Sequence, residues 1–290
     1  MKRQKKTTLQ FLAYISPWLI GFACFGIFPM LYSLYISFCN YMMVGEPKFI
    51  GFQNYIDLFR YERNFFKTFQ NTFVFMGATT IFGLSLGLLF SMMINSVPRC
   101  KRFFQTLYYL PAVLPFIAGT MLWESMYAKY GILNSILNTF GMDSVNFMGY
   151  DNAMKSLIVM SVWGGVGGKI TMFLPAVAGV PSELLESMDL DGANAWQKFA
   201  HVTLPMISPT IFYLLIMDII GGLQAYGPMM MLGGGTATMT ATLQIYNYAM
   251  VDRSMGYASA YAWIVFLIVL AVTFVFFRFG GRKVYYADSD

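Results

Sequence analysis

Long windows without a charged side chain constrain the fold of this chain more than any other feature. No Asp, Glu, Lys or Arg lies between Lys6 and Glu46. A helix that crosses a hydrocarbon core of about 30 Å needs about 20 consecutive apolar residues. Four uncharged windows reach that length, and two more carry one charge each, Lys169 and Asp218. We therefore predict six membrane-spanning segments: residues 11–38, 68–98, 103–123, 156–180, 206–232 and 254–277.

Composition independently favours a membrane protein. Hydrophobic residues make up 57% of the 290 residues, charged residues only 11%, and the mean hydropathy is +0.56, whereas soluble domains are about 25% charged. The bilayer offers no water to backbone polar groups, so spans are helices or closed barrels, and the alternating segments of a barrel are absent. The predicted class is an all-α polytopic membrane protein. We expect one transmembrane domain, residues 1–290, with a tail, first span and outer loop in 1–66 and a core in 67–282.

The distribution of Lys and Arg predicts the orientation, because basic residues gather in short cytoplasmic segments. With the N-terminus inside, eleven basic residues fall inside: Lys2, Arg3, Lys5, Lys6, Arg99, Lys101, Arg102, Lys198, Arg278, Arg282 and Lys283. Seven fall in the longer outer loops: Lys48, Arg60, Arg63, Lys67, Lys129, Lys155 and Arg253. Both termini and the loop between the fourth and fifth spans, residues 182–205, are therefore expected to face the cytoplasm.

This polar loop has the pattern of two short helices. Ser182 is expected to cap the first helix, Gly192 permits a turn, and residues 193–201 can form the second helix. Acidic and apolar side chains would then project from the membrane surface: Glu186, Asp189, Asp191, Trp196 and Phe199. Such a surface predicts insertion into a groove on a partner protein.

The spacing in the loop carries a family resemblance. Gly192 follows Glu186 by six positions, and an apolar-x-Leu-Pro sequence begins ten positions later and ends at Pro205. This resembles the "EAA loop" of binding-protein-dependent ABC importers. Nearly the whole chain is similar to carbohydrate-uptake permeases of the maltose type, specifically to the first of their two permease subunits. The similar segments are residues 28–38, 51–55, 110–111, 233–235, 255–260 and the ending Arg282-Lys283-Val284-Tyr285-Tyr286.

The resemblance implies a transport subunit in a prokaryotic cell membrane. Its expected partners are membrane lipid, a second homologous permease, two ATP-binding subunits and an extracytoplasmic solute-binding protein that delivers a sugar. ATP and Mg would bind those ATPase subunits, with no cofactor and no metal in this chain. The basic inner segments already account for the pI of about 9.0, so no nucleic acid is expected. The residues expected to couple to the ATPase are Glu186, Asp189, Asp191, Gly192, Ala193, Trp196, Phe199, Leu204 and Pro205.

Sugar sites combine hydrogen-bonding groups with apolar and aromatic surface. By resemblance, the sugar lies near the middle of the membrane, on the fourth and fifth spans. The expected substrate-binding residues are Ser161, Trp163, Gly164, Gly165, Lys169, Asp218, Gly221, Gln224 and Tyr226. Each glycine has an equally good interpretation as a helix-packing residue.

Lys169 and Asp218 leave two interpretations open. A charge in the middle of a bilayer costs about 2.5 to 3.5 kcal/mol on insertion scales, so each should face the protein interior or water. The two residues can form a structural ion pair. Alternatively, Lys169 contacts an anionic sugar and Asp218 accepts sugar hydroxyl groups; a neutral polar residue would be expected at position 169 in the family.

Two other classes of membrane protein explain fewer features of the sequence. An intramembrane enzyme would need nucleophiles or metal ligands in the spans, but the one histidine, His201, lies in the polar loop. The phosphate-binding sequence Gly-x4-Gly-Lys-Ser/Thr is also absent, so no ATPase or other catalytic site is expected. An ion-coupled secondary transporter or channel for a small polar solute would suit the charged residues in the spans, but it does not explain the 182–205 loop.

Overall fold

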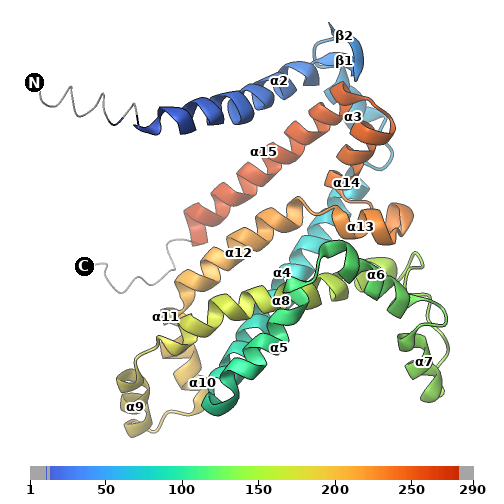
Figure 1. Cartoon of the computed structure of the whole chain (residues 1–290). Helices are drawn as coiled ribbons and strands as arrows, with labels where there is room; N and C mark the ends of the chain where they lie inside the picture. The colour runs from blue at the N-terminus through green and yellow to red at the C-terminus, as the bar shows by residue number, and fades with distance from the viewer. Residues whose placement is uncertain (1–10, 12–13, 281–290) are drawn as a thin grey trace, which may run out of the picture. The chain divides into compact units, whose positions relative to one another are not determined.

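The computed structural model describes Phe11 and residues 14–280, which are mainly helical (Figure 1). This confirms the all-α class. Five helical stretches are long and apolar enough to cross a membrane, and a bent helix pair brings the number to six when it counts as one span. The five stretches are Tyr14–Ser37, Phe65–Asn95, Ala153–Ala178, Ser208–Leu232 and Met255–Arg278. The terminal basic residues of the orientation argument, Lys2, Arg3, Lys5, Lys6, Arg282 and Lys283, lie outside the described residues, as does the ending through Tyr286.

The third predicted span is broken into α5 (Lys101–Val113) and α6 (Phe116–Tyr127). The direction of the chain changes by 93° between α5 and the stretch that begins with α6 and includes α7 (Ile132–Thr139). Leu114 and Pro115 have extended backbone, with ψ of 133° and 135°. A proline disfavours the helical conformation of the residue before it, so Pro115 accounts for the end of the helix at Leu114.

Contacts divide the chain into two compact units, and helix α15 (Met255–Gly280) contributes to both. The first unit takes in residues up to Arg63 and Ile245–Phe266. Its elements before α15 are η1 (Ala23–Ile27), α2 (Phe28–Ser37), β1 (Cys39–Met42), β2 (Val44–Phe49), α3 (Gln53–Arg60) and η5 (Asn247–Val251).

Polar contacts organise this first unit around a small hairpin. Strand β1 pairs antiparallel with β2, with an irregularity between Asn40 and Met42. The Asn54 amide of α3 donates to the carbonyl oxygens of Ser37 and Cys39, both at 2.9 Å. These bonds fix α3 against the end of α2 and the start of the hairpin.

The second unit takes in Asn64–Gln244 and the chain from Leu267. Helix α8 (Ala153–Ala178) packs against α4 (Phe65–Asn95) and α5, and α12 (Ser208–Leu223) packs mainly on α4. After α8 come the loop helices α9 (Ser182–Leu190), α10 (Ala195–Lys198), η3 (Phe199–Thr203) and α11 (Leu204–Met206). After α12 come α13 (Gly227–Leu232), η4 (Gly235–Ala237) and α14 (Ala241–Tyr246), while η2 (Pro98–Cys100) links α4 to α5.

Glycines allow close helix contacts in this second unit. A Cβ atom on Gly167 of α8 would lie 2.4 Å from the Tyr108 carbonyl oxygen of α5. A Cβ atom on Gly222 of α12 would lie 2.8 Å from Cγ of Met76 in α4. Small residues let membrane helices approach and gain van der Waals contact where no hydrophobic driving force acts between them.

Candidate functional site

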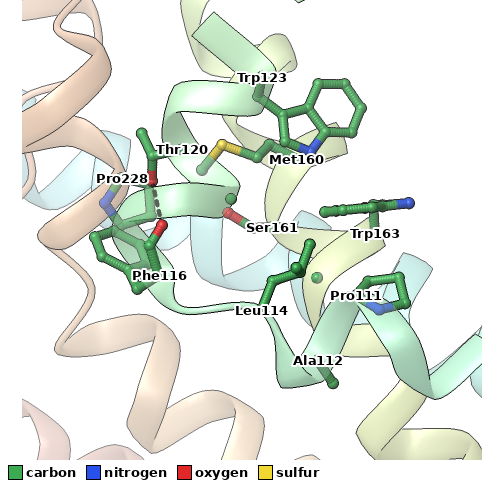
Figure 2. Close-up of a pocket in the computed structure, with 12 residues that line it drawn as sticks. Pro111, Ala112, Leu114, Phe116, Thr120, Trp123, Met160, Ser161, Trp163 and Pro228 are labelled. Atoms are coloured by element: carbon green, nitrogen blue, oxygen red, sulfur yellow. Dashed lines mark hydrogen bonds between the residues drawn. The ribbon is translucent and has the colours of Figure 1, made fainter.

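A first cavity lies beside the break between α5 and α6, and we call it the tryptophan cavity. It has a volume of about 260 Å³. Its walls come from the break, from α8 and from α13 (Figure 2). The lining residues are Pro111, Ala112, Leu114, Phe116, Gly119, Thr120, Trp123, Met160, Ser161, Trp163, Gly164 and Pro228.

The tryptophan cavity combines aromatic surface with two polar atoms that lack a partner. The rings of Trp123 and Trp163 meet edge to face, with centroids 5.6 Å apart. Trp123 Nε1 and Ser161 Oγ are buried without a hydrogen bond among the described residues. Thr120, in contrast, donates from Oγ1 to the Phe116 carbonyl oxygen at 2.9 Å, the dashed line of Figure 2. Buried polar groups normally have a partner, so the two free groups mark this wall as a candidate binding surface.

A second cavity of about 160 Å³ lies between α4, α8 and α12, and we call it the ion-pair cavity. Ser161 lines it as well as the tryptophan cavity. Lys169 Nζ of α8 lies 3.1 Å from Asp218 Oδ1 of α12, and their side chains are 13% and 21% exposed. The two charges predicted within the spans therefore pair with each other, and the pair forms part of the cavity wall. The other lining residues are Phe75, Thr79, Val162, Met217, Gly221 and Gly222.

The structure brings together most of the residues predicted to bind substrate. Ser161, Trp163 and Gly164 line the tryptophan cavity, while Lys169, Asp218 and Gly221 join Ser161 around the ion-pair cavity.

The remaining three predicted residues line neither cavity. Gly165 lies beside Lys169, where a Cβ atom would be 3.5 Å from Nζ. Gln224 and Tyr226 are exposed in the link between α12 and α13. That link interrupts the helix between Leu223 and Gly227, inside the predicted span 206–232, which corresponds to the candidate membrane span Ser208–Leu232.

Sequence reasoning missed the contributions of α4 and of the α5–α6 break, notably Thr79, Thr120 and Trp123. The prolines of the third span were the available signal, because a broken helix inside a membrane protein commonly lines a cavity. Within the part of the chain that the structure describes, no three His, Cys, Asp or Glu side chains gather as metal ligands would.

The loop between α8 and α12 forms two short helices, but their starts differ from the prediction. Ser182 is the first helical residue and makes no side-chain cap; Pro181 occupies the cap position with ψ of 130°. The second helix starts at Ala195 and not at residue 193. Asn194 caps it, since its Oδ1 accepts from Gln197 N at 2.9 Å while Gln197 Oε1 accepts from Asn194 N at 2.7 Å. This reciprocal capping box satisfies two otherwise unpaired backbone donors.

The turn between the two loop helices is fixed by Gly192 and by an ion pair. Gly192 has φ of +76°, a conformation that only glycine adopts without strain. Lys198 Nζ lies 2.7 Å from Asp189 Oδ1 across the turn. Asp189 thus has a partner inside the loop, although its side chain is 57% exposed.

Apolar side chains remain on the surface of the loop. Leu190 is 91% exposed and Trp196 is 71% exposed, while Phe199 is half-buried with its ring centroid 5.5 Å from that of Trp196. Glu186, Asp191, Gly192 and Leu204 are also exposed, and Ala193 and Pro205 are half-buried. Figure 1 shows α9 and α10 beyond the ends of α8 and α12, at the end of the second unit away from α6 and α7.

Comparisons with known proteins agree with this architecture. The chain is 31% identical over 99% of its length to the probable ABC transporter permease protein YesP of Bacillus subtilis (strain 168), of which the match covers 95%. It is 29% identical to the arabinooligosaccharides transport system permease protein AraP of Halalkalibacterium halodurans, covering 89% of this chain and 84% of that protein. Its fold matches a chain of a bacterial ABC transporter involved in the import of the acidic polysaccharide alginate, with a TM-score of 0.85, 24% identity, and coverage of 99% and 100%.

The family model described as "binding-protein-dependent transport system inner membrane component" matches residues 79–283. This range contains α8, α12, the tryptophan cavity, the 182–205 loop and every residue that lines the ion-pair cavity except Phe75. The chain therefore belongs to the family of inner-membrane permease components of binding-protein-dependent ABC transport systems.

Proposed function

We propose that this permease imports a sugar or oligosaccharide, and that residues 182–205 couple it to an ATPase. The observation that carries the coupling role is the pair of short, exposed helices in the loop, where Leu190 and Trp196 are uncovered. Exposed aromatic and aliphatic side chains beside satisfied polar groups are typical of the central contacts of a protein interface.

The saccharide class is supported by the tryptophan cavity and by the relatives. Aromatic faces and unpartnered hydrogen-bonding groups in one cavity suit the apolar and hydroxyl surfaces of a sugar ring. The name of AraP assigns arabinooligosaccharides to that relative, and the structural neighbour takes part in the import of alginate.

The complete importer contains, in our proposal, a second homologous permease, two ATP-binding subunits and an extracytoplasmic solute-binding protein. Both termini and the 182–205 loop face the cytoplasm. The loaded binding protein docks outside, ATP closes the two ATPases, and the loop helices transmit that movement so that the cavity opens outward. Hydrolysis of ATP, bound with Mg on the ATPases, then returns the cavity to face inward.

A matched pair of glycine variants tests the coupling role. Gly192 and Gly141 have φ of +76° and +74°, and a Cβ atom would meet nothing within 4 Å at either position. Valine at positive φ is strongly disfavoured, so both substitutions strain a turn equally. Gly192→Val should abolish co-purification of the ATPase subunits and ATP hydrolysis driven by the sugar-loaded binding protein, whereas Gly141→Val should retain co-purification.

Equal loss in the two variants would contradict the coupling role, because the strain alone would then account for it. Transport by this chain in liposomes without the ATPase would contradict an ATP-driven importer and favour an ion-coupled carrier or channel.

A further inference from the structure

The ion pair of α8 and α12 is placed where a solute can reach it. Lys169 and Asp218 are neither sealed in protein nor fully exposed, since their side chains keep 13% and 21% of their accessible surface. They line a cavity of about 160 Å³, well above the ~10–15 Å³ that a cavity needs to hold a water. A pair with a purely structural role would need no such access.

Helix α4 fixes the position of Lys169. A Cβ atom on Gly83 would lie 2.9 Å from Cε of Lys169, and a Cβ atom on Gly87 would lie 2.7 Å from its Cβ. The lysine thus lies along a surface of α4 that has no side chains. Its ammonium group reaches Asp218 Oδ1 at 3.1 Å.

Two polar atoms of this cavity remain available for a hydrogen bond with a ligand. Asp218 Oδ2 is buried and has no partner among the described residues, and the same holds for Ser161 Oγ. Thr79 Oγ1 is already engaged, because it donates to the Phe75 carbonyl oxygen at 2.8 Å. An ionised carboxylate only accepts hydrogen bonds, so a sugar hydroxyl that reaches Oδ2 can donate to it, whereas a second carboxylate cannot.

The charge of the pair points to the same class of ligand. Lys169 and Asp218 together carry no net charge, so this wall offers no free cation to an acidic sugar. A carboxylated sugar could bind Lys169 only by displacing Asp218, and breaking a largely buried pair leaves an uncompensated charge at a large cost.

We propose that Asp218 Oδ2 accepts a hydrogen bond from a hydroxyl group of an uncharged sugar residue, and that Lys169 is a positioning residue that keeps Asp218 ionised and oriented. This inference rests on the proposed import of a saccharide. It narrows the substrate to a neutral saccharide, in contrast to the acidic polysaccharide named for the structural neighbour.

The test uses the complete transporter in liposomes, with its binding protein and labelled arabinotriose, galactotriose or xylotriose. Asp218→Asn should lower uptake of the transported trisaccharide about tenfold, as expected for the loss of one charge-assisted hydrogen bond. ATP hydrolysis driven by the binding protein is measured in the same liposomes, and a variant that has lost a sugar contact should consume more ATP for each sugar imported. Thr80→Val is the matched control: Thr80 Oγ1 is also buried without a partner, but Thr80 is not among the residues that line either cavity.

Two further variants separate this role from a structural one. The exchange Lys169→Asp/Asp218→Lys keeps an ion pair but moves the carboxylate from α12 to α8. The transporter should therefore still assemble, while uptake of the trisaccharide should stay low. Recovery of wild-type uptake in the exchange variant would overturn the inference. Lys169→Met/Asp218→Asn removes both charges and serves if Asp218→Asn alone fails to assemble; wild-type uptake in that variant would also overturn the inference.

A pair of trisaccharides that differ in charge tests the substrate class. Wild-type uptake of trigalacturonate should be at least tenfold slower than uptake of the neutral trisaccharides. If acidic trisaccharides alone are imported, the inference is wrong and the importer proposal stands. If no saccharide is imported, the inference of a neutral sugar and the proposal of saccharide import are both wrong.

Discussion

The missing Cβ atom of Gly167 allows α5 and α8 to approach closely in the second unit. Gly167 and Gly168 are neighbours on α8, but only Gly167 lies against another helix. A Cβ atom at Gly167 would be 2.4 Å from the Tyr108 carbonyl oxygen, while a Cβ atom at Gly168 would meet nothing within 4 Å. The contact between α5 and α8 therefore depends on one missing methyl group.

Gly167→Ala should destabilise the permease by about 1 to 3 kcal/mol, the usual cost of forcing extra volume into a packed site. The thermal unfolding midpoint of the purified permease would measure the change. Gly168→Ala is the control and should leave the midpoint nearly unchanged. An unchanged midpoint in Gly167→Ala as well would show that α5 and α8 can separate without cost.

At the scale of elements, the break between α5 and α6 determines one wall of the tryptophan cavity. Pro115 ends α5 at the preceding residue, and Gly227 of α13 lies against Phe116 of α6, with a built Cβ atom 2.8 Å from Phe116 Cζ. The break is thus specified by the local sequence and supported by tertiary packing.

Pro115→Ala should let α5 and α6 join into a straighter helix, because it removes the restriction on Leu114. Spin labels at the exposed positions 106 and 125 would then move apart toward about 29 Å, the rise of an unbroken helix over that interval at ~1.5 Å per residue. Pulsed electron paramagnetic resonance measures the distance between the two labels. Pro175→Ala, inside α8 where the helix continues past the proline, should leave it unchanged. An unaltered distance in Pro115→Ala would assign the break to packing alone.

Prolines also show why the elements were only partly predictable from sequence. Apolar length with at most one charge was enough to locate five of the six predicted spans, since it is a property of each segment by itself, but it did not predict the break in the third span. Pro111 and Pro175 lie inside helices while Pro115 precedes a new one, and sequence alone does not separate these outcomes. Likewise, Ser182 was predicted to cap α9, but it is the first helical residue, because the extended backbone at Pro181 already marks the start of that helix. The side-chain cap in the loop is Asn194, which caps α10.

At the scale of the whole molecule, the charge distribution predicts which side each loop occupies. Single cysteines at the exposed positions Ser187 and Ser144 test it, in a chain with Cys24, Cys39 and Cys100 replaced by serine. A membrane-impermeant maleimide applied to intact cells should label residue 144 and spare residue 187 until the cells are lysed. The reverse pattern would invert the orientation, and the proposed docking loop would then lie on the wrong side for an ATPase.

The residues of the candidate site were partly predictable from the sequence, but its geometry was not. Lys169 and Asp218 stood out as charges within spans, and both interpretations of them were consistent with the sequence. Their separation of 3.1 Å arises from the packing of α8 and α12 on α4. No local pattern encodes that distance.

The ion pair has a mechanical consequence for the loop. Helix α8 precedes residues 182–205 in the chain and α12 follows them. The ion pair of Lys169 and Asp218 therefore joins the two helices that flank the loop. The part of α8 between Lys169 and the loop is about 14 Å long at ~1.5 Å per residue. A displacement of the loop would then move α8 and α12 together, and the movement would reach the wall of the ion-pair cavity, which Lys169 and Asp218 line.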